Sequence, residues 1–435
     1  MFRYIIRKIL YGFIVLFGVI TAIFVLFNIK PGDPALLLGG QHSSEEVIQN
    51  IRKDLGLDLP FHKRYLLYLN DLSIFSIHEL ENNNSHIFLD NDKYSYKQLV
   101  NLSDNKTFVL KYPYLQKSYQ NKRNVNDIII EKFPDTIILA FSAIFIASVL
   151  GIFLGIISAL RKGEFYDEAS FIISIAGMSA PSFFMAAIIS VVGGYVWANT
   201  MNLPVFPLVL MLLALLVGLI RTYVEGKSGL TINKVLSWIF KGGIIGLGIW
   251  MLYIILISVF RFNEIPILSS TFSISGTGLS PSGSLIELND YTGNEEYHWE
   301  NLILPAFTLG IRPMAIILQL TRNSLIDVLQ QDYIRTARAK GLSKFKIVYK
   351  HALKNAINPV ITAISGWFAS LLAGAVFVEQ IFSWNGIGSE LVMALKNDDF
   401  ILVMGITIVI AIFFVFINII VDIIYALIDP RVVLK

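Results

Sequence analysis

Long apolar stretches recur along most of the chain and alternate with polar segments. A helix that crosses a bilayer needs about 20 predominantly apolar residues. Stretches of about this length occupy eight places in the sequence, at positions 9 to 29, 137 to 160, 169 to 198, 204 to 221, 237 to 260, 302 to 321, 359 to 380 and 400 to 428. The pattern predicts an all-α polytopic membrane protein. Two of these stretches, 204 to 221 and 237 to 260, are the least regular, because prolines open the first and glycines interrupt the second.

One polar region is far too long for a connecting turn. Residues 31 to 135 are rich in Asn, Asp, Lys and Tyr, and they predict an extracytoplasmic loop or subdomain between the first two helices. Apolar residues between 47 and 70 recur at helical spacing, which predicts a helix that lies along the membrane surface. Residues 88 to 119 alternate loosely between apolar and polar types, which predicts short strands.

These features divide the chain into six segments. They are a first transmembrane helix (1–30), the extracytoplasmic loop or subdomain (31–135), transmembrane helices 2 and 3 (136–199), an insertion with two extra spans (200–262), an extracytoplasmic loop (263–301) and a transmembrane core (302–435) that contains a cytoplasmic loop (322–358). The first apolar run is longer than a signal-peptide core, and no small-residue cleavage site follows it. We therefore expect it to remain as an uncleaved span.

The basic residues predict the orientation of the chain. Short cytoplasmic connections of membrane proteins carry an excess of Lys and Arg. Alternate connections here contain Arg161 and Lys162, then Arg221, Lys227 and Lys234, and then all the Lys and Arg residues of 322–358, whereas acidic residues dominate 263–301. This alternation predicts that both termini are cytoplasmic.

Composition agrees with a membrane protein and argues against other classes. The chain is 55% hydrophobic and 15% charged, whereas a soluble domain is about 25% charged. Its net charge of +3 is small, and its basic residues follow the membrane pattern, so nucleic acid is not an expected partner. The chain has no cysteine, and its six histidines lack ligand spacing. We therefore expect neither a disulfide nor a metal site.

Two spans carry small residues four positions apart. Such stripes let helix backbones approach closely in a bilayer. The second span has Ala147, Gly151, Gly155 and Ala159, and the seventh has Gly366, Ser370 and Gly374. Packing within one subunit is one interpretation of these stripes, and a subunit interface or a pathway wall is the other.

Arg312 is an ionisable residue at membrane depth. Such residues are energetically costly and point to function by default. Because Arg312 precedes Pro313, it lies where a loosened helix leaves carbonyl groups free. It is predicted to face the pathway or to pair with an acid such as Asp422, and a purely structural ion pair is equally open. Asp422 is interfacial instead if it lies at the cytoplasmic end of the last span.

The segment from Gln331 to Thr362 combines basic residues with an apolar stripe. Apolar residues recur near helical spacing at Ile334, Ala337, Phe345, Val348 and Ala352. Gly341 interrupts the pattern, Ser343 can cap a second helix, and Pro359 opens the next span. The segment therefore predicts two short helices with a bend. A basic loop also satisfies the positive-inside rule alone, but an ordered apolar face on a solvated loop indicates a partner surface.

These residues carry a family resemblance. The sequences RTARAKGL (335–342) and HALKNAINPV (351–360) resemble the cytoplasmic loop of binding-protein-dependent ABC importer permeases, in the form typical of the dipeptide, oligopeptide and nickel branch. In that superfamily the loop contains Glu-Ala-Ala, three residues and then Gly. Arg335, Thr336, Ala337 and Gly341 occupy those positions, with Arg and Thr in place of Glu and Ala.

Further stretches resemble the B-type permease of peptide systems. They are KPGDP (30–34), APSFF (180–184), FVEQIFSWNGIGSEL (377–391) and DIIYALIDPRV (422–432). The loop near 75–125 and the segment 208–260 depart from that pattern. The resemblance implies a type I ABC importer-like bundle of six core helices plus two extra spans in the bacterial cytoplasmic membrane.

The resemblance also implies a function and a set of partners. The chain is expected to be a non-catalytic permease subunit of an oligopeptide or dipeptide importer, working with a second homologous permease, two ATPase subunits, an extracytoplasmic substrate-binding protein and the lipid bilayer. The loop that couples to the ATPase is expected to comprise Arg335, Thr336, Ala337, Arg338, Ala339, Lys340, Gly341, Leu342, Ser343, His351 and Pro359.

ATP and Mg are expected on the partner subunits, and no cofactor on this chain. The segment EGKSG (225–229) contains Gly-Lys-Ser, but Arg221 stands where a phosphate-binding loop needs its first glycine. Two alternatives remain open. One is a permease for nickel or a metal chelate, and the other is a membrane sensor or adaptor whose basic loop binds a signalling partner.

Overall fold

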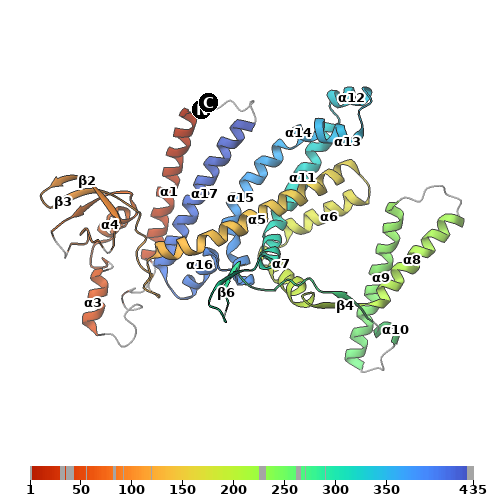
Figure 1. Ribbon diagram of the computed structural model, residues 1–435, viewed down its shortest axis with the longest axis horizontal. Coiled ribbons are helices and arrows are strands. Elements are labelled where there is room, and N and C mark those ends of the chain that lie inside the picture. The colour runs from red at the N-terminus through yellow and green to blue at the C-terminus, as the bar shows by residue number, and fades with distance from the viewer. Residues whose placement is uncertain are drawn as a thin grey trace. The chain divides into compact units, whose positions relative to one another are not determined.

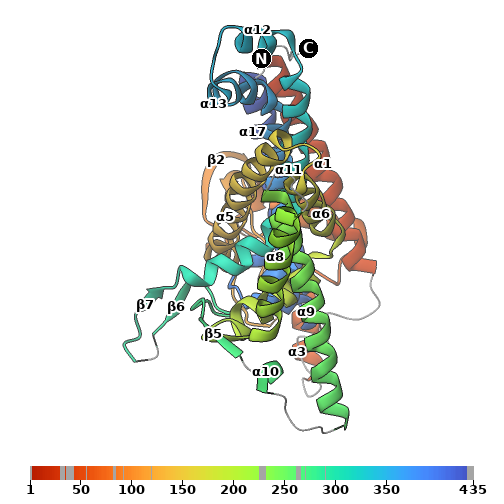
Figure 2. The same ribbon diagram turned by 90° about the vertical axis from the view of Figure 1, so that its right-hand side faces the viewer.

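The computed structural model describes residues 2–29, 35, 44–54, 56–81, 85–91, 93–118, 120–224, 232–260, 266–269, 271–289 and 291–428. The KPGDP motif, the EGKSG segment and the residues from 429 onward lie outside these ranges. Helices dominate the described chain (Figures 1 and 2). It forms two compact units, one of Met1–Phe141, Ser365–Gln380 and Trp384–Lys435, and the other of Ser142–Ile364 and Ile381–Ser383.

The described residues contain five helices long and apolar enough to cross a membrane, and seven spans if each of two bent helix pairs counts as one. The five are α1 (Phe2–Ile29), α5 (Val125–Leu160), α9 (Ile232–Phe260), α11 (Glu300–Leu329) and α17 (Phe400–Ile428). The prediction of an all-α polytopic membrane protein is confirmed. Helix α8 (Val205–Val224) has an apolar part, Val205–Gly218, that is shorter than a full span.

The third predicted span is not one straight helix. Helix α6 (Phe165–Ser179) is followed by α7 (Ser182–Ile189) and a π-helix, η1 (Ser190–Val196). The chain bends by 111° between α6 and the continuous segment of α7 and η1. Between them Ala180 and Pro181 are extended, with ψ angles of 131° and 137°. Proline disfavours the helical conformation of the residue before it and has no N–H to donate. The helix predicted over 169–198 is therefore broken at Pro181.

Helices α1 and α17 lie side by side in the first unit (Figure 1). Lys8 Nζ, near the start of α1, lies 2.6 Å from Asp422 Oδ2, near the end of α17. This ion pair places the beginning of the first helix and the end of the last helix at the same end of the unit. At the other end, a core forms around Ile23, Phe24, Tyr68, Val125, Ile128, Ile401 and Ile406.

The long polar region contains both predicted kinds of element. Two helices, α3 (Glu45–Asp54) and α4 (Phe61–Leu72), precede a three-stranded antiparallel sheet of order β1-β3-β2. The strands are β1 (Phe75–Glu79), β2 (Tyr96–Ser103) and β3 (Lys106–Lys111). In register, Ile77 pairs with Phe108, which in turn pairs with Val100. The predictions of a helical segment and of short strands are confirmed.

A buried polar cluster joins α4 to this sheet. Asp71 is 1% exposed and accepts a hydrogen bond from the Tyr94 hydroxyl at 2.6 Å, while Lys111 Nζ donates to the Asp71 carbonyl at 2.6 Å. His78 is fully buried, with Nδ1 3.1 Å from the Ile87 carbonyl and Nε2 3.0 Å from Ser76 Oγ. Only a neutral imidazole with a proton on Nδ1 can donate to the carbonyl and accept from the hydroxyl.

A buried carboxylate organises the FVEQIFSWNGIGSEL motif. Glu379 of α15 (Asn358–Phe382) is 0% exposed and accepts hydrogen bonds from the backbone N–H groups of Gly388 and Ser389, at 2.7 and 3.0 Å, and from Thr136 Oγ1 at 2.7 Å. Those amides open helix α16 (Ile387–Lys396). A carboxylate at a helix N-terminus satisfies donors that have no partner within the helix. The Glu therefore fixes the turn between α15 and α16.

The second unit is built on a close approach of α5 and α11. A Cβ atom at Gly151 would lie 2.9 Å from the Met314 carbonyl, and one at Gly155 would lie 2.6 Å from Thr321 Cβ. Any larger residue would separate these backbones. The stripe that begins at Ala147 thus packs within the subunit, as one interpretation predicted. In the other stripe, a Cβ atom at Gly366 or Gly374 would have open space around it within the described part of the chain, and the role of that stripe stays a prediction.

The insertion forms a helical hairpin in the same unit. Helices α8 and α9 pack along each other, and a Cβ at Gly242 would lie 2.7 Å from the Leu210 carbonyl. The short helix α10 (Pro266–Ser269) follows, and β4 (Thr200–Pro204) pairs antiparallel with β5 (Thr271–Ser275) across the base of the hairpin. A separate ribbon of β6 (Ile286–Leu288) and β7 (Glu295–Tyr297) precedes α11.

The buried imidazole makes the stability of the polar subdomain dependent on pH. Burial, together with the positive charge of Lys111, lowers the pKa of His78 from its ordinary 6.5 to about 4. Between these values the unfolded chain binds more protons than the folded one, so stability is complete above pH 6.5 and falls as the pH drops toward 4. The full loss is about 3 kcal/mol. Hydrogen exchange of β1 and β3 amides, corrected for intrinsic rates, measures it between pH 7 and 5.

The matched variants are His78→Asn and His62→Asn. Asparagine can donate to the Ile87 carbonyl but does not titrate, so His78→Asn should flatten the pH dependence. His62 is exposed, and His62→Asn should behave like the original chain. If His78→Asn keeps the original pH dependence, another group is responsible.

Candidate docking surface between α11 and α15

The chain between α11 and α15 folds into short helices. It consists of α12 (Asp332–Ala339), α13 (Lys344–Lys346), a π-helical turn η2 (Ile347–Ala352) and α14 (Leu353–Ala356). Figure 2 shows α12 and α13 beyond one end of α11. The two predicted helices are therefore present, the second of them with a π-helical turn.

Gly341 makes the bend between these helices. Its φ of +73° is left-handed, a region that costs a residue with a side chain about 1–2 kcal/mol. Its N–H donates to the Arg338 carbonyl at 2.9 Å, and the N–H of Leu342 donates to Ala337 at 3.3 Å, which closes the end of α12. Ser343 Oγ then accepts from the Lys346 N–H at 3.4 Å. The predicted bend and the predicted cap are confirmed.

The apolar stripe faces the chain itself. Ile334 and Ala352 are fully buried and Ala337 is 6% exposed. With Ile347 and Ala356 they form one core with Ala159 of α5 and Leu325 of α11. The inference that the whole stripe marks a partner surface is therefore wrong for these residues. They attach the loop to the helices below it.

The surface left to a partner is aromatic and basic. Phe345 is 78% exposed and Tyr349 is 69% exposed, and their rings stack in parallel with centroids 6.0 Å apart. Tyr333 is 42% exposed and its hydroxyl accepts from Asn355 Nδ2 at 2.8 Å. Lys344, Lys346 and Lys350, which flank the two rings in the sequence, are also exposed. Sequence reasoning missed Tyr349, which the spacing of two aromatic residues four apart could have indicated.

The other expected coupling residues belong to the same segment of the chain or to the start of α15. Arg335 is 74% exposed and pairs with Asp332 at 3.4 Å, while Arg338 Nη2 donates to the Leu329 carbonyl at 3.4 Å. Thr336 Oγ1 donates to the Asp332 carbonyl at 3.1 Å. Of the remainder, Leu342 and His351 are half-buried, and Ala339, Lys340 and Pro359 are exposed. Their part in coupling stays a prediction.

A carboxylate network ties α6 to the end of α11 that carries the loop. Asp167 is 6% exposed and binds Arg322 through both oxygens, at 2.5 and 2.8 Å. It also accepts from Ser158 Oγ at 2.5 Å and from the Gly163 N–H at 2.9 Å. Such bidentate, charge-assisted pairing fixes orientation as well as distance. The sequence signal was an acid just after a basic connection, and it was not recognised.

Arg312 and Asp422 lie in different units. Arg312 is exposed on α11, and Asp422 is bound to Lys8. Their pairing, and a role of Arg312 in the pathway, stay predictions. Among the described residues, no group of three or more His, Cys, Asp or Glu side chains could hold a metal ion.

Comparison with known proteins identifies the family. A model described as "Binding-protein-dependent transport system inner membrane component" matches residues 151–434, and a model for the N-terminal part of such components matches residues 1–86. The chain belongs to this family. Membership confirms the resemblance drawn from the loop and makes the chain a multi-pass membrane component of a transport system.

The similarity to known permeases covers nearly the full length of this chain and of its relatives. The dipeptide transport system permease protein DppB of Alkalihalophilus pseudofirmus is 29% identical over 99% of both chains. The di/tripeptide transport system permease protein DppB of Pseudomonas aeruginosa is 28% identical over 96% of this chain and 94% of the relative. A probable D,D-dipeptide transport system permease protein of Escherichia coli gives the same identity and the same shares.

The network at Asp167 should stabilise the transport component measurably. Asp167→Asn removes the charge opposite Arg322, whose side chain is only 25% exposed, and should lower the free energy of unfolding by about 2–3 kcal/mol. Denaturant unfolding in detergent measures this loss, and adding Arg322→Gln should recover part of it. The control is Glu164→Gln, which breaks an exposed pair with Arg161 and should cost less than about 0.5 kcal/mol. Equal losses in Asp167→Asn and Glu164→Gln would contradict the assignment.

Proposed function

We propose that this chain is the non-catalytic permease subunit of an ATP-binding-cassette importer for dipeptides or oligopeptides, and that it forms half of the translocation pathway. The observation that carries the proposal is similarity over 99% of the chain to a relative named as a dipeptide permease. That span includes both the membrane helices and the docking loop, which is the segment 332–356 between α11 and α15. The names of the similar proteins favour peptides over nickel or a metal chelate, and family membership disfavours a sensor or adaptor.

The loop geometry supports coupling to a separate ATPase. Interfaces concentrate binding energy in a few aromatic and Arg residues surrounded by less important contacts. The stacked Phe345 and Tyr349 rings supply such an anchor, and the exposed lysines that flank them in the sequence favour an acidic rim on the partner. ATP and Mg act on that partner. Hydrolysis there would move the loop, which would carry α11 with it through the buried core around Leu325.

The complete importer would contain a second homologous permease, two ATPase subunits and an extracytoplasmic substrate-binding protein. The chain would lie in the bacterial cytoplasmic membrane with both termini in the cytoplasm. The Lys8–Asp422 ion pair supports a common side for the two termini, because it joins the start of α1 to the end of α17 at one end of the first unit. The alternation of basic connections then favours the cytoplasmic side for that end.

Uptake assays test the substrate class. Cells that lack this chain but keep the rest of the transport system should take up labelled dipeptides and longer peptides at background rate, and restoring the chain should restore uptake. Nickel uptake should not change. Loss of nickel uptake with unaffected peptide uptake would overturn the proposal in favour of the metal alternative.

The aromatic anchor gives a sharper prediction. Phe345→Ala combined with Tyr349→Ala should weaken ATPase binding by about 30-fold or more for each ring removed, because buried aromatic anchors contribute about 2 kcal/mol or more each. The helices should still form, since both side chains are exposed. Co-purification of the ATPase and peptide uptake measure the effect. The control is Tyr291→Ala, which removes a 99% exposed aromatic residue from the β6–β7 connection. Unchanged ATPase binding in the double variant would refute the anchor.

Topology can be tested on the same loop without background, because the chain has no cysteine. Ser343→Cys should react with an impermeant thiol reagent only from the cytoplasmic side, and it should cross-link to the ATPase. Labelling from outside the cell would reverse the proposed orientation.

A further inference from the structure

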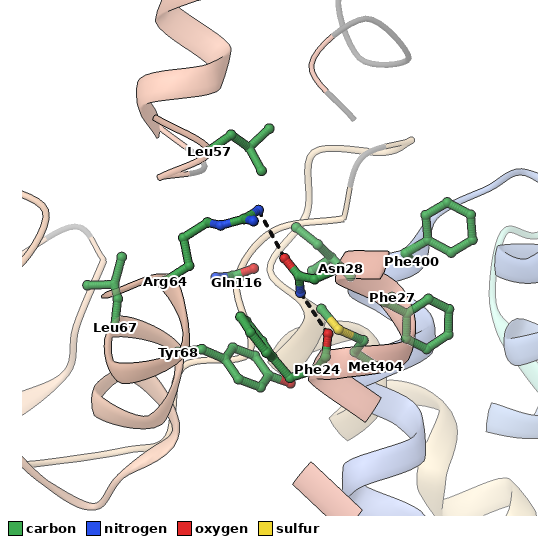
Figure 3. A pocket seen from close by; sticks show the side chains of 11 residues that line it. Phe24, Phe27, Asn28, Leu57, Arg64, Leu67, Tyr68, Gln116, Phe400 and Met404 are labelled. Carbon is green, nitrogen blue, oxygen red and sulfur yellow. Dashed lines mark hydrogen bonds between the residues drawn. The ribbon is translucent and has the colours of Figure 1, made fainter. Parts of the chain in front are cut away.

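A small cavity of about 80 Å³ lies in the first unit, where α1, α4 and α17 meet (Figure 3). Its walls are mostly apolar and aromatic. The apolar and aromatic part includes Phe24, Phe27, Phe400, Ile401, Met404 and Tyr68, and Asn28 and Gln116 are polar lining residues. The cation Arg64 also lines the cavity. Its Nη1 donates a hydrogen bond to Asn28 Oδ1 at 3.1 Å. Asn28 Nδ2 in turn donates to the Phe24 carbonyl at 2.8 Å, which holds the amide in place.

One donor of the guanidinium is buried but unpaired within the described part of the chain. Arg64 Nε is buried and has no hydrogen-bond partner among the described residues. A buried polar atom without a partner is rare and destabilises the fold, more so when it belongs to a charged group. Because Nε and Nη present neighbouring donors on one planar group, the missing partner is best supplied by an oxyanion.

The depth of the cavity indicates where that oxyanion comes from. The apolar span of α1 runs from Ile6 to Asn28, so Arg64 and Asn28 lie at the level where the hydrocarbon ends. Lipid phosphates are concentrated at this level, and aromatic side chains are common there. Phe24, one helical turn before Asn28, offers an apolar wall toward the membrane centre.

We propose that this cavity binds the phosphodiester group of an anionic phospholipid. The phosphate accepts a hydrogen bond from Arg64 Nε inside the cavity, whose volume suffices for that group alone, and the glycerol and acyl chains extend from it into the bilayer. The net positive charge of the guanidinium selects an anionic lipid over a zwitterionic one. The lipid joins α4 of the polar subdomain to the end of α1.

Binding of phosphatidylglycerol by the full-length chain tests the proposal. Delipidated protein in neutral detergent is titrated with phosphatidylglycerol, phosphatidylcholine or inorganic phosphate, and native mass spectrometry and the melting temperature report binding. Phosphatidylglycerol should bind and raise the melting temperature, whereas the other two should have little effect. Arg64→Gln should weaken phosphatidylglycerol binding about ten-fold, since it removes a charged hydrogen bond.

Two further variants separate the site from general effects of charge. Lys63→Gln removes an exposed cation of the same helix and should bind lipid like the original chain. Asn28→Asp places a carboxylate 3.1 Å from the guanidinium, where it should repel the phosphate and weaken lipid binding while Arg64 stays paired. This second variant carries the test if Arg64→Gln does not fold.

Three results would overturn the proposal. Wild-type lipid affinity in both Arg64→Gln and Asn28→Asp would mean that only water reaches Nε. An equal effect of inorganic phosphate would make the site one for a free anion. An equal effect of phosphatidylcholine would remove the selection for an anionic lipid.

Discussion

The contact of α5 with α11 is the constraint on which the second unit depends. Helices gain little from hydrophobic association inside a bilayer, so they must pack by close van der Waals approach. Gly151 and Gly155 make this possible, because a Cβ at either position would come within 3 Å of α11. Helix α11 in turn carries both Arg322, which holds α6, and Leu325, which holds the docking loop. One glycine contact therefore sets the position of the elements around the loop.

Polar groups in both units tie helix ends together. Asp167 of α6 accepts four hydrogen bonds, from α5, from the α5–α6 connection and from α11. Glu379 of α15 accepts three, from α5 and from the start of α16. A buried carboxylate is tolerated when its oxygens are satisfied in this way. Arg64 differs because its Nε has no partner among the described residues, and this difference is what points to a ligand there.

The membrane class, the bend at Gly341 and the cap at Ser343 were predictable from the sequence, because apolar run length, left-handed glycine and N-capping serine are local signals. The break at Pro181 was missed because an apolar run has the same composition on both sides of it. The burial of Ile334 and the exposure of Phe345 could not be separated, since both lie on one amphipathic pattern. That pattern shows that a face will be covered, but not whether the chain or a partner covers it.

The docking loop divides its apolar residues between two tasks. Small and branched residues such as Ala337 and Ile334 pack beneath it, where close contact with α5 and α11 resists movement of the loop relative to the bundle. Large rings at Phe345 and Tyr349 point away from that core. A loop attached only by its ends would bend when displaced and would not move the helices. A loop without exposed rings would present little apolar surface to a partner protein. The coupling to an ATPase that we propose needs both firm contact with the partner and a stiff connection to the helices, and the division of residue types along this segment meets both needs.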